Sequence, residues 1–317
     1  MKIHYKNPDI ESTQEMLKEH NIQLESIQVS RGIHSSETEG LLFPTIRLSK
    51  ITQMASSVVF MNGRNPCDDF NLQIPMDNSY IKINGQKISA EGFNLSAPNE
   101  ILQIPASLYS SRKRVNLYFS KSVLADHIGQ NEVETLIKQL PAIRGKKDNS
   151  NLFIEHQKEM VTYVNQVINS SVTFDFQAIK DIEETLYTFI SSLISSFDDV
   201  TGQITDRRLT NHLSIIQRVL DFLESTATIN ISKPLILEQA FCSARALDYA
   251  FQSVIGIPFK KYIILRRMHL IKKELLHTED IVMKNIVKKY GVVNVGRFTS
   301  DFHTLFGVHP KELVFKE

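Results

Sequence analysis

The stretch RFTSDFHTLFGVHP, residues 297–310, places Phe302 five positions before Gly307. An earlier stretch, ALDYAFQSVIGIP at residues 246–258, has a phenylalanine and a glycine at the same interval, 51 residues before. The same shift lays apolar or small residues over one another on both sides: Leu235 and Ile236 over Ile286 and Val287, Ala240 over Gly291, Leu247 over Phe298, Phe251 over Phe302, Gly256 over Gly307, and Ile257 over Val308. The chain therefore contains one short structural unit twice.

Each copy has the pattern of helix, tight turn, helix and stop. Ser243 and Asn294 stand where an N-cap of the second helix is expected. Gly256 and Gly307 stand where that helix would end in a left-handed residue. The pattern predicts helix-turn-helix motifs at about residues 233–255 and 283–306.

A single helix connects the two predicted motifs. The segment FKKYIILRRMHLIKKELL, residues 259–276, fits one helix of roughly 25 Å. Recognition helices in successive major grooves lie about 34 Å apart. One chain could therefore place two helices on one face of a DNA duplex.

Charge is distributed unevenly along the chain. The net charge of the whole sequence is +1, but residues 206–317 contain 17 Lys plus Arg against 11 Asp plus Glu, a net of +6. This asymmetry indicates a polyanionic partner for the C-terminal part.

The repeated segment resembles the DNA-binding domain of AraC/XylS-family transcription regulators. The resemblance covers residues about 212–316 and rests on SARALDYAFQSVIGIPFKKYIILRRMHLIKKELL and IVKKYGVVNVGRFTSDFHTLFGVHPKEL. It implies a promoter-binding regulator, more often an activator than a repressor. It also implies double-stranded DNA as partner, RNA polymerase as a further partner, and a small-molecule effector.

By position in the family motif, the first recognition helix begins near Ser243. Its groove-facing residues would be Arg245, Asp248 and Tyr249, followed by Gln252. Arg245 can bind a guanine edge and Asp248 can accept from a cytosine amine. The equal alternative is that Asp248 faces solvent or pairs with a nearby basic side chain. The connecting helix offers basic residues for phosphate contacts, with a plain solvated face as the alternative: Lys260, Lys261, Arg266 and Arg267.

The second recognition helix departs from the family. Val292 stands where members carry phenylalanine, and the serine-rich start is VNVG. Its groove-facing residues would be Val295, Gly296 and Ser300, with Arg297 beside them. Val295 can touch a thymine methyl, whereas Gly296 has no side chain to bond. We therefore expect this copy to contribute phosphate and shape contacts, through Asn294, Arg297 and Ser300, more than base discrimination.

The N-terminal part is expected to be a cupin-like β-barrel or sandwich. Residues 40–120 hold short strand candidates, and Asn84-Gly85 predicts a type I′ hairpin. The stretch YIKINGQKISAEGFNLSAPNEILQIPA resembles the cupin-like domain that precedes the DNA-binding domain in many family members, where it holds an effector or takes part in dimerisation.

Helices are expected after this barrel. An apolar stripe at helical spacing is either core or the seam of a homodimer: Ile179, Ile182, Leu186, Phe189 and Leu193. The predicted α+β organisation is an effector domain at 1–125, a helical dimerisation region at 126–200, a linker at 201–211 and a DNA-binding domain at 212–317.

Other classes of protein find little support in the sequence. No phosphate loop, dinucleotide fingerprint or nucleophile elbow is present. None of the ten histidines lies between His34 and His127, so no metal site is expected in the barrel, and no cofactor. No apolar run is long enough for a membrane span, and two cysteines build no disulfide framework. We expect a cytoplasmic protein.

Two alternatives to a regulator stay open. The first is a protein-interaction module whose second motif no longer reads DNA. The second is an enzyme built on the β region, which would need an acid–base or metal constellation that the sequence does not offer.

Overall fold

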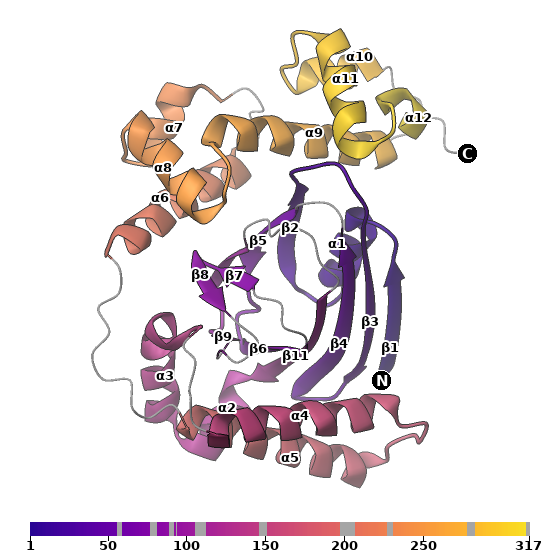
Figure 1. The fold of residues 1–317 in the computed structure, drawn as a ribbon, viewed down its shortest axis with the longest axis vertical. Coiled ribbons are helices and arrows are strands. Elements are labelled where there is room, and N and C mark those ends of the chain that lie inside the picture. The colour runs from indigo at the N-terminus through magenta and orange to yellow at the C-terminus, as the bar shows by residue number, and fades with distance from the viewer. Residues whose placement is uncertain are drawn as a thin grey trace.

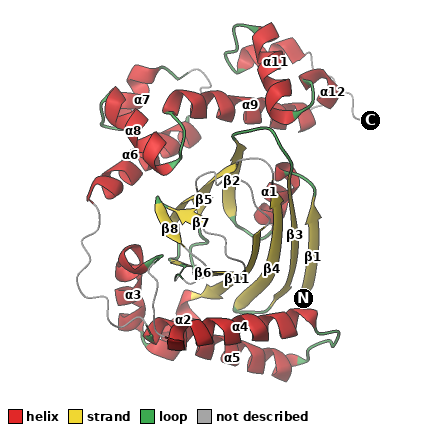
Figure 2. Cartoon of the chain, viewed as in Figure 1, coloured by secondary structure: helices red, strands yellow, loops and turns green. Residues whose placement is uncertain are grey.

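The computed structural model describes residues 1–55, 59–76, 81–88, 92, 94–104, 112–145, 151–196, 207–226, 231–277 and 283–314. An N-terminal region rich in strands is followed by helices that cover one end of it, and an all-helical C-terminal region lies at the opposite end (Figure 1). Figure 2 shows the same division by type of element. None of the helices in these ranges is both long enough and apolar enough to cross a bilayer.

The largest sheet is six-stranded and antiparallel, in the order β1-β3-β4-β11-β6-β9. Its strands are β1 (Lys2–Asn7), β3 (His34–Leu42), β4 (Ile46–Ala55), β6 (Asp69–Pro75), β9 (Leu95–Ser96) and β11 (Arg112–Ser120). Alternate residues of β6 and β11 are buried hydrophobics, and Leu72 lies opposite Leu117 in the register. This period of two gives the sheet one apolar face.

Four helices at one end of the sheet contribute buried residues to the same apolar cluster: α2 (Lys121–Ile128), α3 (Gln130–Ile143), α4 (Asn151–Asn169) and α5 (Phe176–Ser195). Phe119 on β11 packs edge to face against Tyr187 on α5, with ring centroids 6.2 Å apart. Ser120 is the last residue of β11, and its side chain caps α2 by accepting from the backbone N–H of Val123. The sheet and these helices therefore share one core.

The apolar stripe on α5 belongs to this core. Ile182, Leu186 and Leu193 are buried within the protomer, and Leu186 is 0% exposed. Only Ile179 and Phe189 of the predicted dimer seam keep partly exposed side chains. The prediction of a seam made by all five residues is corrected accordingly, because three of them are already buried in the core of the protomer.

A second, three-stranded sheet has the order β10-β5-β2 and faces the C-terminal region. Its strands are β2 (Gln23–Gln28), β5 (Val59–Arg64) and β10 (Ile101–Ile104), and α1 (Ile10–Glu19) packs beside β2. A hairpin of β7 (Ile81–Ile83) and β8 (Gln86–Ile88) lies next to it. Asn84 and Gly85 have φ of 51° and 78°, so the predicted type I′ hairpin is confirmed.

The C-terminal region is entirely helical in its described residues. It comprises α6 (Arg207–Ser225), α7 (Lys233–Gln239), α8 (Ala244–Val254), α9 (Phe259–His277), α10 (Met283–Lys289), α11 (Val295–Phe306) and α12 (Pro310–Val314). Residues 207–211, expected in the linker, are the first residues of α6; residues 201–206 lie outside the described residues. The predicted fold class, a sheet domain followed by helices and then an all-helical domain with a connecting helix, is confirmed.

Candidate DNA-binding surface

The first helix-turn-helix unit is formed by α7 and α8. The Ser243 side chain accepts from the backbone N–H of Ala246 at 3.2 Å, as expected of an N-cap. Leu247 and Phe251 on the inner face of α8 are fully buried. This burial holds α8 against α9, with the Phe251 ring centroid 5.0 Å from that of Phe259.

The second unit, α10 and α11, repeats this construction. Asn294 accepts from the backbone N–H of Arg297 at 2.9 Å and caps α11. Phe298 and Phe302 are buried, and Gly307 ends α11 with φ of 76°. The capping and stop positions predicted for both copies are confirmed, and Gly256 likewise has a left-handed φ of 86°.

The turns of the two units differ in length. The left-handed residue that ends the first helix is Phe241 (φ 49°) in one unit and Gly291 (φ 66°) in the other. In both cases the next residue donates its N–H to a carbonyl of the preceding helix: Cys242 to Leu237, and Val292 to Val287. These equivalences are 50 residues apart, whereas the N-caps are 51 apart, so the second turn contains one extra residue.

The alignment of Ala240 with Gly291 is therefore wrong. Residues before the turn correspond at a shift of 50, and only those from the N-cap onwards correspond at 51. Ala240 is the last right-handed residue of the first helix, with φ of −81°. By the structure, Ile236 is equivalent to Ile286, and both are buried.

The outer face of α8 presents the side chains predicted to face the groove. Arg245 is exposed and donates to the Tyr249 hydroxyl at 3.2 Å, with its guanidinium over the Tyr249 ring. Asp248 lies 3.7 Å from the Lys233 ammonium. Gln252 donates to the carbonyl of Gly256 and so lies at the far end of α8. Arg245 and Tyr249 form one exposed pair at the N-terminal half of the helix.

Two of the exposed residues on the outer face of α11, Gly296 and Ser300, have a small side chain or none. Gly296, Arg297 and Ser300 are exposed, and Arg297 Nε lies 3.7 Å from Asp301. Val295, expected to face the groove, is instead partly buried and packs against the core of the helical region. The expectation that Val295 projects from the helix is corrected on this point.

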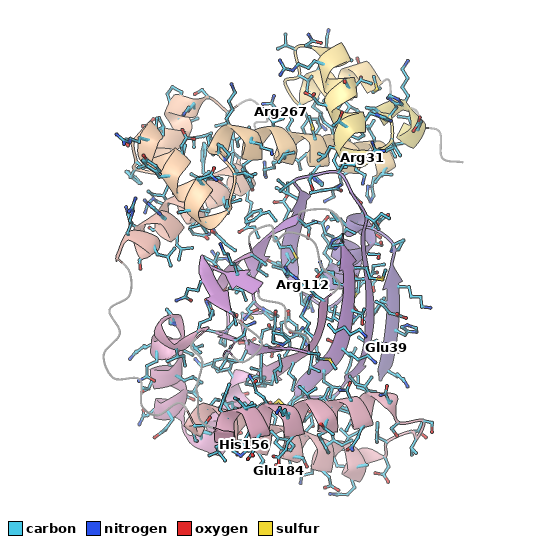
Figure 3. All side chains as sticks on the ribbon, viewed as in Figure 1. Arg31, Glu39, Arg112, His156, Glu184 and Arg267 are labelled. Atoms are coloured by element: carbon cyan, nitrogen blue, oxygen red, sulfur yellow. The ribbon has the colours of Figure 1, made fainter. Side chains whose placement is uncertain are left out.

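The four basic residues of α9 fall into two kinds. Lys260 and Lys261 are exposed. Arg266 and Arg267 are half-buried and donate to backbone carbonyls, of Leu223 and of Gly291, at 3.4 Å each. Figure 3 labels Arg267 on α9, on the side of the second unit. Arg266 thus contacts α6 and Arg267 contacts the turn between α10 and α11, a role that spacing alone did not indicate.

One exposed aromatic side chain at the first turn was not predicted. Phe241 is 83% exposed. The guanidinium of Arg218 lies over its ring, 6.0 Å from the centroid, and Arg218 Nε donates to the carbonyl of Ala240. The sequence could not indicate this arrangement, because it gives Phe241 no partner within reach along the chain.

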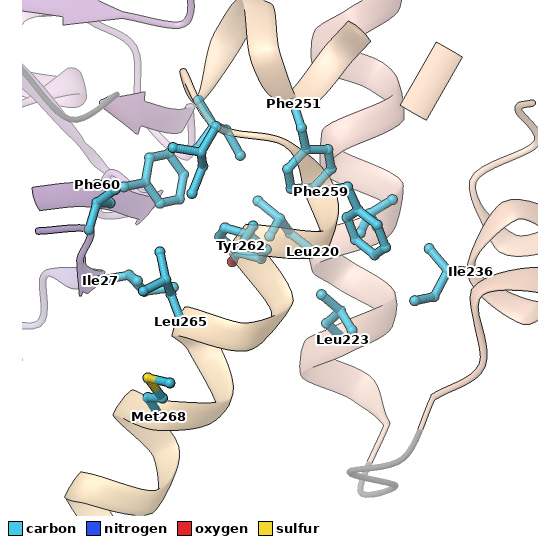
Figure 4. Packing of buried hydrophobic residues seen from close by; sticks show 14 of the residues in the cluster. Ile27, Phe60, Leu220, Leu223, Ile236, Phe251, Phe259, Tyr262, Leu265 and Met268 are labelled. Atoms are coloured by element: carbon cyan, nitrogen blue, oxygen red, sulfur yellow. The ribbon is translucent and has the colours of Figure 1, made fainter. Parts of the chain in front are cut away.

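The sheet domain packs directly on the helical region. Phe60 on β5 is fully buried and meets Tyr262 on α9 edge to face, with centroids 5.9 Å apart (Figure 4). Ile27 on β2 joins the same cluster. Burial raises the pKa of the Tyr262 phenol, so it stays neutral.

Polar contacts extend this interface towards the second unit. The backbone N–H of Gln28 donates to Nε2 of His269 at 2.7 Å, and the side-chain amide of Gln28 donates to the carbonyl of Leu305 on α11. Burial lowers the pKa of His269 to about 3, so its ring is neutral. The Lys272 ammonium lies 2.7 Å from a Glu11 carboxylate oxygen. Arg31 lies beside Gly307 at the end of α11 (Figure 3).

A cavity of about 530 Å³ lies between the two regions. Its walls come from α1, β2 and β5 on one side and from α6 and α9 on the other. Both regions contribute charged side chains to the lining, among them Lys18, Glu25, Arg64, Glu224 and Lys273. The cavity therefore borders α9, the helix that joins the two units.

Comparisons with known proteins bear on the helical region. Residues 236–314 match the family model described as a helix-turn-helix domain. The chain is 27% identical over 100 residues to the probable thc operon regulatory protein of Rhodococcus erythropolis, covering 31% of this chain and 30% of that protein. It is 31% identical over 98 residues to the XylDLEGF operon transcriptional activator of Pseudomonas putida, covering 30% of each. The match thus spans less than a third of the length of these relatives, which are regulators rather than enzymes.

Among solved structures, the AraC-like transcriptional activator CuxR is similar with a TM-score of 0.43 and 12% identity, covering 86% of this chain and 96% of that one. The matched family model and the regulator relatives coincide with the two capped, repeated units around α9. The C-terminal part of the chain is therefore a helix-turn-helix domain of the AraC/XylS type.

Proposed function

We propose that the chain is a sequence-specific DNA-binding transcription regulator, an activator rather than a repressor, and that its α8 and α11 occupy successive major grooves. The observation that carries the proposal is the pair of helix-turn-helix units joined by α9. That helix has 19 residues and is about 28 Å long, close to the one-turn spacing of about 34 Å that two grooves on one face require.

The two units have different tasks in this proposal. Arg245 at the start of α8 reads a base edge, and Tyr249 holds its guanidinium in place. Lys260, Lys261 and Arg297 neutralise phosphates. The capping residues Ser243 and Asn294 still have a hydroxyl and an amide proton to donate to the DNA backbone.

The sheet domain is the control module of this regulator. A small-molecule effector or a partner that binds it would act on α9 through the contacts of Phe60 with Tyr262 and of Gln28 with His269. RNA polymerase is the expected partner of an activator. A homodimer is proposed as well; on α5 it would use the partly exposed Ile179 and Phe189.

The salt dependence of binding tests the proposal against a protein-interaction module. The full chain is titrated onto the duplex that it selects from a random-sequence pool, at several salt concentrations. About six phosphate contacts would make the logarithm of the binding constant fall with a slope of about −5 against the logarithm of salt. Failure to select any duplex, even at low salt, would favour the interaction module.

A further inference from the structure

Val293 is the extra residue in the turn of the second unit, and its side chain is open to solvent. It lies between Val292, which packs against the core, and the N-cap Asn294. Its side chain is 99% exposed. The first unit has no counterpart, because Cys242 there directly precedes the N-cap Ser243.

A folding role for this valine is not supported by its surroundings. An apolar residue directly before an N-cap often packs on the fourth residue of the helix and so fixes the entry of the chain. The fourth residue of α11 is Phe298, which is buried, whereas Val293 is open to solvent. The turn therefore gains no packing from Val293.

At the start of α11, Val293 is the most exposed apolar side chain. Gly296 has none, although space for one exists: a Cβ there would meet only Asn294 Oδ1, at 3.6 Å. Val295 is partly buried against the core of the helical region. The N-terminal residues of a recognition helix are those that reach base edges in the major groove.

The chemistry of the side chain selects the base. Valine has neither donor nor acceptor, so it cannot read hydrogen-bonding groups. In the major groove, apolar side chains recognise the C5 methyl group, which among the four unmodified bases only thymine carries. The exposed Lys288 and Arg297 flank the turn and provide charges for the adjoining phosphates.

We propose that Val293 is a specificity-determining residue of the second unit, and that it reads the C5 methyl group of a thymine in the groove occupied by α11. This proposal rests on the proposed function. It assigns base reading to a residue outside the recognition helix, in the unit where the helix itself offers little.

Replacement of thymine by deoxyuridine removes only the methyl group and therefore tests the contact. The probe is the duplex that the full wild-type chain selects from a random pool, together with versions in which each thymine in turn is deoxyuridine. The proteins are wild type, Val293→Ala and Val293→Thr, which keeps one methyl group. Val172→Ala is the matched control, because Val172 is an exposed valine (68%) in the connection between α4 and α5.

When deoxyuridine replaces one or two thymines within the groove of α11, we expect the affinity of wild type to fall about fourfold, as for a buried methylene-sized group. Val293→Ala should bind the thymine duplex more weakly than wild type by a similar factor, and deoxyuridine at those positions should not weaken it further. Val293→Thr should lose less affinity than Val293→Ala, and Val172→Ala should behave as wild type. Equal losses for Val293→Ala on both duplexes, or no methyl effect of wild type in that groove, would overturn the proposal.

The test separates this inference from the function on which it rests. If wild type selects no duplex, both fall. If it selects a duplex and occupies two grooves while Val293→Ala binds as wild type does, the inference alone is wrong.

Discussion

Phe241 and Gly291 occupy the same left-handed position in the two helix-turn-helix units, one as an exposed aromatic residue and the other as glycine. Left-handed backbone costs a non-glycine residue roughly 1–2 kcal/mol. The first unit therefore carries a strain in its turn that the second does not.

Reciprocal substitutions at these positions should have opposite effects. Gly291→Ala should lower the free energy of unfolding by about 1 kcal/mol, because alanine is strained at this φ. Phe241→Gly should keep or raise it by up to about 1 kcal/mol, since its mostly exposed ring loses little burial. Urea unfolding followed by circular dichroism measures both. A loss for Phe241→Gly as large as that for Gly291→Ala would contradict this comparison.

Removal of the Phe60 ring should weaken the whole chain from within the domain interface. Phe60→Ala deletes a fully buried ring against Tyr262 and should lower the free energy of unfolding by about 3 kcal/mol. The control is Phe176→Ala, whose ring is 82% exposed and whose effect should stay within about 0.5 kcal/mol. If urea titrations showed that Phe60→Ala lowers the free energy of unfolding no more than Phe176→Ala does, the interface would contribute no stability.

Acidification should weaken the contact between Gln28 and His269. The folded pKa of His269 is about 3, below the ordinary value of about 6.5. The unfolded chain therefore binds a proton more readily, and stability is lost as pH falls from about 6.5 towards 3. Between pH 7 and 5 this amounts to at most about 2 kcal/mol. His269→Gln should remove this part of the pH dependence; an unchanged slope in unfolding titrations would show that His269 is not its source.

Leu186→Asp tests the corrected role of the α5 stripe. Because Leu186 is enclosed by the sheet and by neighbouring helices, a carboxylate there should lower the free energy of unfolding by more than about 3 kcal/mol. Leu152→Asp on α4, at an exposed position, should be tolerated. If sedimentation instead found Leu186→Asp to be a well-folded monomer and wild type a dimer, the stripe would be a dimer seam after all.

Arginine substitutions distinguish base reading from phosphate anchoring. Arg245→Ala should cost about 1–3 kcal/mol on the selected site only, whereas Arg297→Ala should weaken binding to all duplexes uniformly. Binding titrations on the selected duplex and on a scrambled one measure both. Equal weakening of every DNA by both variants would remove the division between reader and anchor.

The repeat could be predicted from the sequence because both units must bury the same inner face. Phe251 and Phe302 are buried in the structure as their spacing indicated. The extra residue of the second turn could not be predicted, since before the turn a shift of 50 also lays apolar residues over one another: Ile236 and Leu237 over Ile286 and Val287. Only the backbone hydrogen bonds of Cys242 and Val292 decide between the two shifts.

The start of the sheet was missed for a related reason. β3 buries His34, Ser36 and Thr38 on one face and exposes Glu37 and Glu39 in part on the other, so its sequence shows no alternation of apolar and polar residues. The contact of Phe60 with Tyr262 joins strands to a helix 202 residues later in the chain. No local pattern contains such information.

The measurement that tests the central claim most directly is a hydroxyl-radical footprint of the full wild-type chain on its selected duplex, at two salt concentrations. The account predicts two protected patches one helical turn apart on the same face, both lost steeply as salt rises. Protection of a single groove, or protection unchanged by salt, would contradict the docking of both units on DNA.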